Sequence, residues 1–287
     1  MAQTGDQQRD QKKEPTLPRV VVFDEPGPPD VLRIVDQPTR APAAGEVSVK
    51  IEGFGVNRLD QMIRAGFSPR PIKLPHARLG VEGTGTIDAI GPDVTGLGVG
   101  DAVLITAVPD MDTNGTHAEQ VVVPANRVVR RPAELNVVNA SALWVSYSTA
   151  YGALVEKAGV RPADNVLITA ASSGVGLAAI QISNQLGAVP IAVTRHPSRK
   201  DALLSAGVAA VIATDQENVA EATRAYTDGV GADIIIDSVM GPGLADLAKA
   251  AKFSGTLVTV GYLDPRPAPV PDGPTDDIPL HELRTHT

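Results

Sequence analysis

Residues 165–181 combine side chains and spacing that could bind the pyrophosphate of a dinucleotide. Their sequence is NVLITAASSGVGLAAIQ, an apolar run followed by small and hydroxyl residues and then by a helical pattern. Small residues at Ala171, Ser173 and Gly176 would let phosphates approach the backbone, and free N–H groups at 174–176 would bind them at the positive end of a helix. The G-x-G-x-x-G spacing is not met, because Ala171 and Ser173 occupy the first two glycine positions. A turn whose glycine serves packing alone is the alternative.

The residues after the next apolar run, at 190–193, indicate which nucleotide would bind. An NAD-type site needs a carboxylate about twenty residues beyond the glycine loop, to accept a hydrogen bond from the ribose 2′-OH. No Asp or Glu stands between Asp164 and Asp201. Hydroxyl and basic side chains stand there instead: Thr194, Arg195, Ser198, Arg199 and Lys200. A 2′-phosphate suits guanidinium and hydroxyl donors, so the sequence predicts NADPH rather than NADH. A solvated basic helix start is the alternative.

The predicted cofactor-binding residues lie at or just beyond the ends of predicted strands. They are Ser172, Ser173, Gly174, Val175, Gly176, Thr194, Arg195, Ser198, Lys200 and Gly261. The last of these follows the final clear apolar run of the chain.

Composition limits the remaining classes of function. The chain has 287 residues, a formal net charge of −8 and no cysteine. The acidic balance predicts neither nucleic acid nor an anionic membrane as partner. Without cysteine, disulfides, thiolate nucleophiles and cysteine-held zinc are excluded, so any redox chemistry must come from a bound group. Residues 1–16 lack the apolar core of a signal peptide, and we expect a cytoplasmic protein.

The elements that would position these residues change type along the chain. The first half predicts a barrel-like β unit, because short apolar strands alternate with Gly and Pro turns. One short helix is expected there, at 58–64. The expected strands are at 20–23, 31–35, 46–52, 85–90, 102–107 and 118–123.

From about residue 141 strands alternate with helices. Continuous apolar strands joined by helices predict an α/β fold with a doubly wound parallel sheet buried on both faces. A helical stretch at 141–157 precedes it. The expected strands are at 165–169, 190–193, 210–213, 233–237 and 256–260. The expected helices are at 174–186, 198–206, 219–226 and 243–252.

Several motifs outside the nucleotide segment resemble those of one enzyme family. They are Gly45-Glu46-Val47, Asn57-Arg58-Leu59-Asp60, Ile63-Arg64-Ala65-Gly66, Leu79-Gly80-Val81-Glu82-Gly83-Thr84-Gly85, Val99-Gly100-Asp101 and Thr149-Ala150-Tyr151. With the 165–181 loop, they make the chain resemble the zinc-independent medium-chain dehydrogenase/reductases, in particular quinone oxidoreductase-like enzymes, over about residues 19–263. Zinc alcohol dehydrogenases of the same superfamily carry His where Val81 stands here.

The resemblance implies a domain arrangement and a reaction. A GroES-like substrate domain is expected at 19–140 and a Rossmann NADP-binding domain at 141–263. The polar, mixed-charge composition of the N-terminal residues separately predicts a disordered tail at 1–18. NADPH would lie between the domains and pass hydride to a quinone or an α,β-unsaturated carbonyl, both small molecules. Without a metal, the developing negative charge on oxygen needs hydrogen-bond donors.

The resemblance also suggests catalytic residues. Asn57 and Thr149 match positions that line the nicotinamide end, although Asn57 could instead cap a loop. Many relatives carry a Tyr where Met62 stands, and Met cannot donate a proton. Tyr147 is the nearest alternative donor, with aromatic packing as its other interpretation. Thr214 replaces an adenosine-side Tyr of some relatives.

The five histidines are too scattered to suggest a metal site. Relatives continue beyond residue 287, so 264–287 is interpreted as a Pro-rich, incomplete C-terminal segment. An unpaired sheet edge would then favour a homodimer. Two other functions stay open: a reductase-derived enzyme catalysing a non-redox cyclisation or isomerisation with nucleotide unused or structural, and a non-enzymatic binding or scaffold protein on the same fold.

Overall fold

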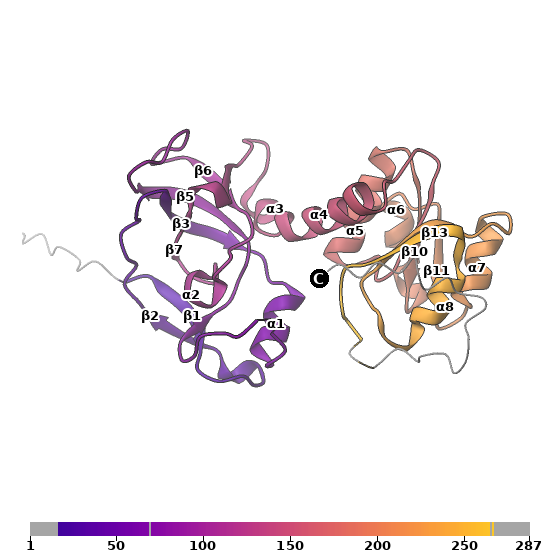
Figure 1. The fold of residues 1–287 in the computed structure, drawn as a ribbon, viewed down its shortest axis with the longest axis horizontal. Helices are drawn as coiled ribbons and strands as arrows, with labels where there is room; N and C mark the ends of the chain where they lie inside the picture. The colour runs from indigo at the N-terminus through magenta and orange to yellow at the C-terminus, as the bar shows by residue number, and fades with distance from the viewer. Residues whose placement is uncertain (1–16, 69, 265, 267–287) are drawn as a thin grey trace, which may run out of the picture. The chain divides into compact units, whose positions relative to one another are not determined.

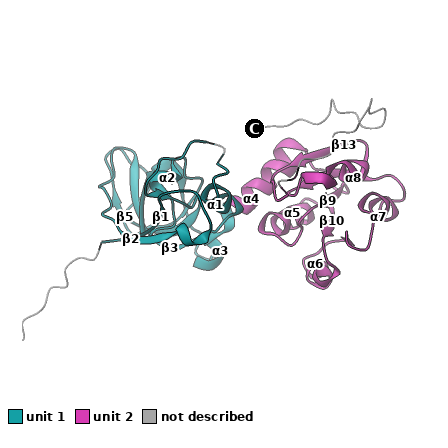
Figure 2. Ribbon diagram, turned by 90° about the horizontal axis from the view of Figure 1, so that it is seen from below, with its two compact units in different colours: residues 1–144 teal, residues 145–287 magenta. Residues whose placement is uncertain are grey.

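The computed structural model describes residues 17–68, 70–264 and 266. The chain divides into two compact units, one ending at Trp144 and the other beginning at Val145 (Figures 1 and 2). The tails expected at 1–18 and 264–287 lie outside the described residues, apart from residues 17, 18, 264 and 266.

The first unit contains two antiparallel sheets. The larger has the order β7-β3-β5-β6-β8, from β3 (Glu46–Phe54), β5 (Gly83–Ile90), β6 (Ala102–Ile105), β7 (Gln120–Pro124) and β8 (Val128–Arg130). The smaller has the order β2-β1-β4, from β1 (Arg19–Phe23), β2 (Arg33–Asp36) and β4 (Ala77–Arg78). Val47 and Val49 of β3, which lies between β7 and β5, are fully buried as expected, and Ser48 between them is buried as well.

Helix α1 (Arg58–Arg64) has the predicted bounds. Its start is set by Asp60, whose carboxylate accepts the N–H of Asn57 at 2.7 Å. The other carboxylate oxygen of Asp60 accepts the N–H of Gly80 at 2.9 Å, so this buried side chain joins the helix to the segment before β5.

The second unit is the predicted parallel sheet, with strand order β11-β10-β9-β12-β13. Its strands are β9 (Asn165–Ile168), β10 (Val189–Thr194), β11 (Ala210–Ala213), β12 (Ala232–Asp237) and β13 (Ala251–Thr259). Its helices are α4 (Leu143–Tyr151), α5 (Gly174–Gln185), α6 (Lys200–Ser205), α7 (Val219–Tyr226) and α8 (Leu244–Lys249). Val166 and Ile168 of β9 belong to one core cluster and Leu167 to another, so both faces of the sheet are buried.

Some predicted bounds were wrong for local reasons. The helix expected at 243–252 ends at Lys249, because Ala251 pairs with Ala232 of β12 and starts β13. The stretch at 141–157 is divided among α3 (Val137–Ser141), α4 and a π-helical turn at Gly152–Lys157. The strand expected at 31–35 begins at Arg33, after a short 3₁₀ turn at Pro29–Val31. Strands β4 and β8 and helix α2 (Met111–Asn114) are too short to give a periodic signal.

Candidate functional site

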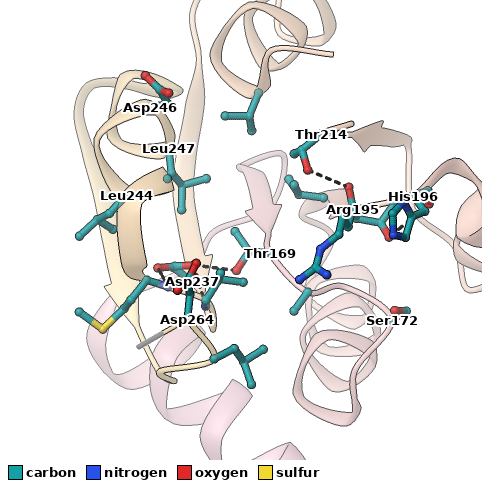
Figure 3. Close-up of a pocket in the computed structure, with 18 of the residues that line it drawn as sticks. Thr169, Ser172, Arg195, His196, Thr214, Asp237, Leu244, Asp246, Leu247 and Asp264 are labelled. Carbon is teal, nitrogen blue, oxygen red and sulfur yellow. Dashed lines mark hydrogen bonds between the residues drawn. The ribbon is translucent and has the colours of Figure 1, made fainter. Parts of the chain in front are cut away.

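A cavity of about 900 Å³ lies in the second unit, where the parallel strands end (Figure 3). Its walls include Thr169 after β9, Thr194 at the end of β10, Thr214 after β11 and Asp237 at the end of β12. The chain order of the strands reverses between β9 and β12, so the cavity spans the point at which open α/β sheets bind ligands.

One wall of the cavity carries hydroxyl and basic groups. Thr194, Arg195 and Ser198 line it, as do His196 and Arg199. These side chains come from one short segment after β10, so the sequence already placed them together. Of the ten predicted cofactor-binding residues, four line the cavity: Ser172, Thr194, Arg195 and Ser198. The other six do not occur among the described residues that line it: Ser173, Gly174, Val175, Gly176, Lys200 and Gly261. Lys200 is the first residue of α6.

The loop before α5 has the tight packing that its small residues suggest. A Cβ added to Gly176 would lie 2.5 Å from the carbonyl oxygen of Ala171, so the helix start and the loop backbone are in direct contact. The N–H of Gly176 donates to Ser173 Oγ at 3.1 Å. The prediction of a free N–H at Gly176 was therefore wrong, because Ser173 caps the helix. Ser172 lines the cavity. The N–H groups of Gly174 and Val175, in the first turn of α5, are the remaining candidates for an anion, although neither residue occurs among the described lining residues.

The opposite wall carries acidic residues that the sequence patterns did not single out. Asp237 is 1% exposed and accepts Thr169 Oγ1 at 2.8 Å and the N–H groups of Val239 and Met240 at 3.0 and 2.9 Å. This carboxylate therefore holds the loop after β12 against the end of β9. The one signal in the sequence was its place at the end of the apolar run DIIID.

Asp264 lines the same cavity. The pKa of Asp264 is lowered to about 2, mainly by hydrogen bonds from the Arg266 side chain and backbone and to a smaller extent by the charges of Arg266 and Arg195. Its N–H donates to the carbonyl of Val239 at 2.9 Å, so the segment after β13 is attached to the loop after β12. Asp264 is therefore an ionised group facing the basic wall (Figure 3).

Met240 also lines the cavity and has a backbone conformation that side chains disfavour. Its φ is 56° and its ψ −142°. Such left-handed angles suit glycine, and a long side chain there indicates local strain.

The predicted catalytic residues lie outside the residues that the structure shows lining this cavity. Tyr147 and Thr149 are half-buried on α4, and the Tyr147 hydroxyl donates to Gln181 Oε1 on α5. This hydrogen bond joins α4 to α5, which agrees with the interpretation that Tyr147 has a packing role. The proton-donor role stays a prediction.

Asn57 belongs to a buried network in the first unit. Its Nδ2 donates to Glu82 Oε1 at 2.8 Å, and Glu82 is 1% exposed. A Cβ added to Gly55 would lie 2.4 Å from that oxygen, so the glycine makes room for the carboxylate. His117 Nε2 donates to the Gly55 carbonyl at 3.2 Å. Asn57 is also the residue before α1, so the capping interpretation has structural support.

Two further properties concern the described residues alone. They contain no group of three or more His, Cys, Asp or Glu side chains arranged to hold a metal ion. In the same part of the chain, every helix is too short or too polar to cross a bilayer.

Family models match both units. The model "Alcohol dehydrogenase GroES-like domain" matches residues 43–133, and "Zinc-binding dehydrogenase" matches residues 174–284. The chain is 32% identical over 249 residues to the quinone oxidoreductase-like protein 2 homolog of Nematostella vectensis, covering 85% of the chain and 65% of that protein. It is 32% identical over 236 residues to erythronolide synthase EryA2 of Saccharopolyspora erythraea, covering 82% of the chain and 6% of the synthase.

Solved structures show the same similarity. A quinone oxidoreductase of Pseudomonas syringae pv. tomato superposes with a TM-score of 0.81 at 27% identity, over 89% of the chain and 77% of that protein. An NAD-dependent alcohol dehydrogenase superposes with a TM-score of 0.79 at 31% sequence identity, over 87% of the chain and 80% of that protein. The Escherichia coli quinone oxidoreductase complexed with NADPH superposes with a TM-score of 0.77 at 26% sequence identity, over 85% of the chain and 73% of that protein. The chain therefore belongs to the medium-chain dehydrogenase/reductase family of oxidoreductases, with a GroES-like domain followed by a Rossmann-like domain.

Proposed function

We propose that the protein is an NADPH-dependent reductase that transfers hydride to a quinone or an α,β-unsaturated carbonyl without a metal. The observation that carries this proposal is the wall after β10, where Arg195, Arg199, Ser198 and Thr194 gather at the rim of the cavity. A 2′-phosphate is a dianion with three acceptor oxygens, and guanidinium and hydroxyl groups are the donors that suit it.

Distinct residues would hold the two phosphate-bearing parts of the cofactor. Arg195, Arg199 and Ser198 would bind the 2′-phosphate of the adenosine. Ser172 and the N–H groups of Gly174 and Val175 would bind the pyrophosphate at the start of α5, where the helix dipole favours an anion. When bound, NADPH supplies the hydride.

The remaining parts of the proposal come from the sequence. Zero cysteines and Val81 support a reaction without zinc. Asn57, Thr149 and Tyr147 stay the predicted residues near the reacting groups. A homodimer in the cytoplasm also stays a prediction, which size-exclusion chromatography with light scattering and a tagged chain in cells would test.

Direct binding tests the cofactor assignment first. We expect the purified protein to bind NADPH more tightly than NADH in a fluorescence titration. Arg195→Glu should weaken NADPH binding at least tenfold, because it places an anion beside the 2′-phosphate. Arg161→Glu is the matched control, since it makes the same charge change at an exposed residue of the same unit that is not among the cavity-lining residues. Equal losses in both variants would contradict the assignment.

Turnover tests the reaction. We expect NADPH oxidation with at least one member of a panel of quinones and enones, in a one-to-one ratio with reduced product. No binding of NADPH and no oxidation across the panel would refute the proposal. Product formation without NADPH consumption would favour the non-redox enzyme, and unchanged properties of Arg195→Glu in every assay would favour a scaffold.

A further inference from the structure

The side chains of His196 and Asp215 form a close contact at the edge of the basic wall. His196 Nδ1 lies 3.1 Å from Asp215 Oδ2. His196 lines the cavity, whereas Asp215 does not occur among the described lining residues. The side chains are 64% and 36% exposed, so both can be replaced without opening a core.

Backbone contacts hold this pair at a defined position. The N–H of Thr214 donates to the carbonyl of Thr194 at 2.9 Å, and the N–H of Asp215 donates to the carbonyl of Arg195 at 3.2 Å. The loop after β11 is thereby attached to the loop after β10. Asp215 is consequently a neighbour of the proposed 2′-phosphate site although it stands 20 residues after Arg195 in the chain.

The position matters because an acidic residue here opposes a phosphate. A carboxylate near the end of the second strand of a Rossmann fold favours a ribose 2′-OH over a 2′-phosphate. The segment after β10 contains no such residue, but the sheet supplies one from the next strand. Charged residues that line the cavity near this pair include Arg195 and Arg199 on the same segment as His196, and Glu217 on the same loop as Asp215. Asp264 faces the same basic wall from the other side of the cavity. Glu217 Oε1 accepts the N–H of Ala213 at 3.2 Å.

We propose that the His196–Asp215 pair determines how strongly the cavity discriminates 2′-phosphorylated from unphosphorylated adenine nucleotides. Asp215 weakens binding of the 2′-phosphate, and His196, when it is protonated, offsets this effect with its positive charge. This proposal rests on the assignment of the wall after β10 to the 2′-phosphate.

A double-mutant cycle with two small ligands tests the proposal. Isothermal titration calorimetry would measure 2′,5′-ADP and 5′-AMP at pH 6, where ordinary imidazoles are largely protonated, and at low salt. For 2′,5′-ADP we expect Asp215→Asn to bind roughly three- to tenfold more tightly and His196→Asn to bind more weakly by a similar factor, because one unit charge changes directly beside the proposed 2′-phosphate site. The double variant should return close to the wild-type affinity. For 5′-AMP each variant should change less than twofold.

Asparagine at 196 can still donate a hydrogen bond to Asp215, so that variant removes charge and keeps the contact. Glu221→Gln is the matched control, because it removes one negative charge from the exposed first turn of α7, outside the residues described as lining the cavity. It should leave the 2′,5′-ADP affinity within twofold. Circular dichroism of each variant would report whether it folds like the wild type.

The outcomes separate this proposal from the cofactor assignment. If the wild type binds neither ligand, both are overturned. If it binds 2′,5′-ADP more tightly than 5′-AMP but all three His196 and Asp215 variants stay within twofold, this proposal alone is overturned. An equal gain in 2′,5′-ADP affinity in Asp215→Asn and Glu221→Gln would also overturn it, because the effect would then come from the net charge of the protein.

Discussion

The variant Met240→Gly should be more stable than Met240→Ala. Elsewhere in a protein the alanine variant is usually the more stable of such a pair. Met240 has φ 56° and ψ −142°, angles that glycine adopts without penalty. A side chain held in such a conformation costs about 1–3 kcal/mol. Glycine loses about 0.5–1 kcal/mol relative to alanine through unfolded-chain entropy. The difference predicts that Met240→Gly is more stable than Met240→Ala by about 1 kcal/mol.

Comparing glycine with alanine isolates the backbone, because both variants remove the methionine side chain beyond Cβ. The surrounding structure holds Met240 in this conformation, since its N–H donates to the Asp237 carboxylate at 2.9 Å. The free energy of unfolding would be measured by urea denaturation followed by circular dichroism, with equal slopes required in both variants. Ala202→Gly, at an exposed position of α6, is the control and should lose about 0.5–1 kcal/mol. If Met240→Ala equals or exceeds Met240→Gly in stability, the strain interpretation is refuted.

Three further predictions concern the same unit. Hydrogen bonds from the side chain and backbone of Arg266 lower the pKa of Asp264 from 3.8 to about 2, so the stability gained from its ionised form is present above pH 4 and is lost as pH falls to 2. Asp264→Asn should therefore be less stable than wild type at pH 7 and equal to it near pH 2 in thermal melts. Gly176→Ala should lower the melting temperature, because the new Cβ meets backbone at 2.5 Å, whereas Gly152→Ala has open space and should not. Thr169→Val should cost about 1–3 kcal/mol in urea denaturation, because the buried Thr169–Asp237 bond is lost; a cost below 0.5 kcal/mol would contradict this account.

Hydrophobic patterning predicted most of the fold. The strand at 210–213 and the helices at 58–64 and 219–226 have the expected bounds. The strands of the parallel sheet are continuously apolar because the sheet is covered on both faces, and such apolar runs can be recognised directly in the sequence. The end of α8 could not be predicted, because pairing of Ala251 with Ala232 overrides a helical pattern that extends past it.

The candidate site was predictable where its residues are contiguous. Thr194, Arg195 and Ser198 lie within one short segment, so the sequence alone predicted that hydroxyl and basic groups gather there, and they line one cavity. The prediction for Gly176 was wrong, because the N–H that was expected to be free donates to Ser173 Oγ. Which of several nearby donors caps a helix depends on side-chain placement that spacing does not specify.

By itself, the sequence determined the parallel sheet, the small-residue loop before α5 and the cluster of basic and hydroxyl groups after β10, because each depends on residues close together in the chain. Only the tertiary structure decided which charges face that cluster. Asp215, Asp237 and Asp264 belong to three different strand ends, and they lie at the same edge of the sheet because parallel strands bring their carboxyl ends together.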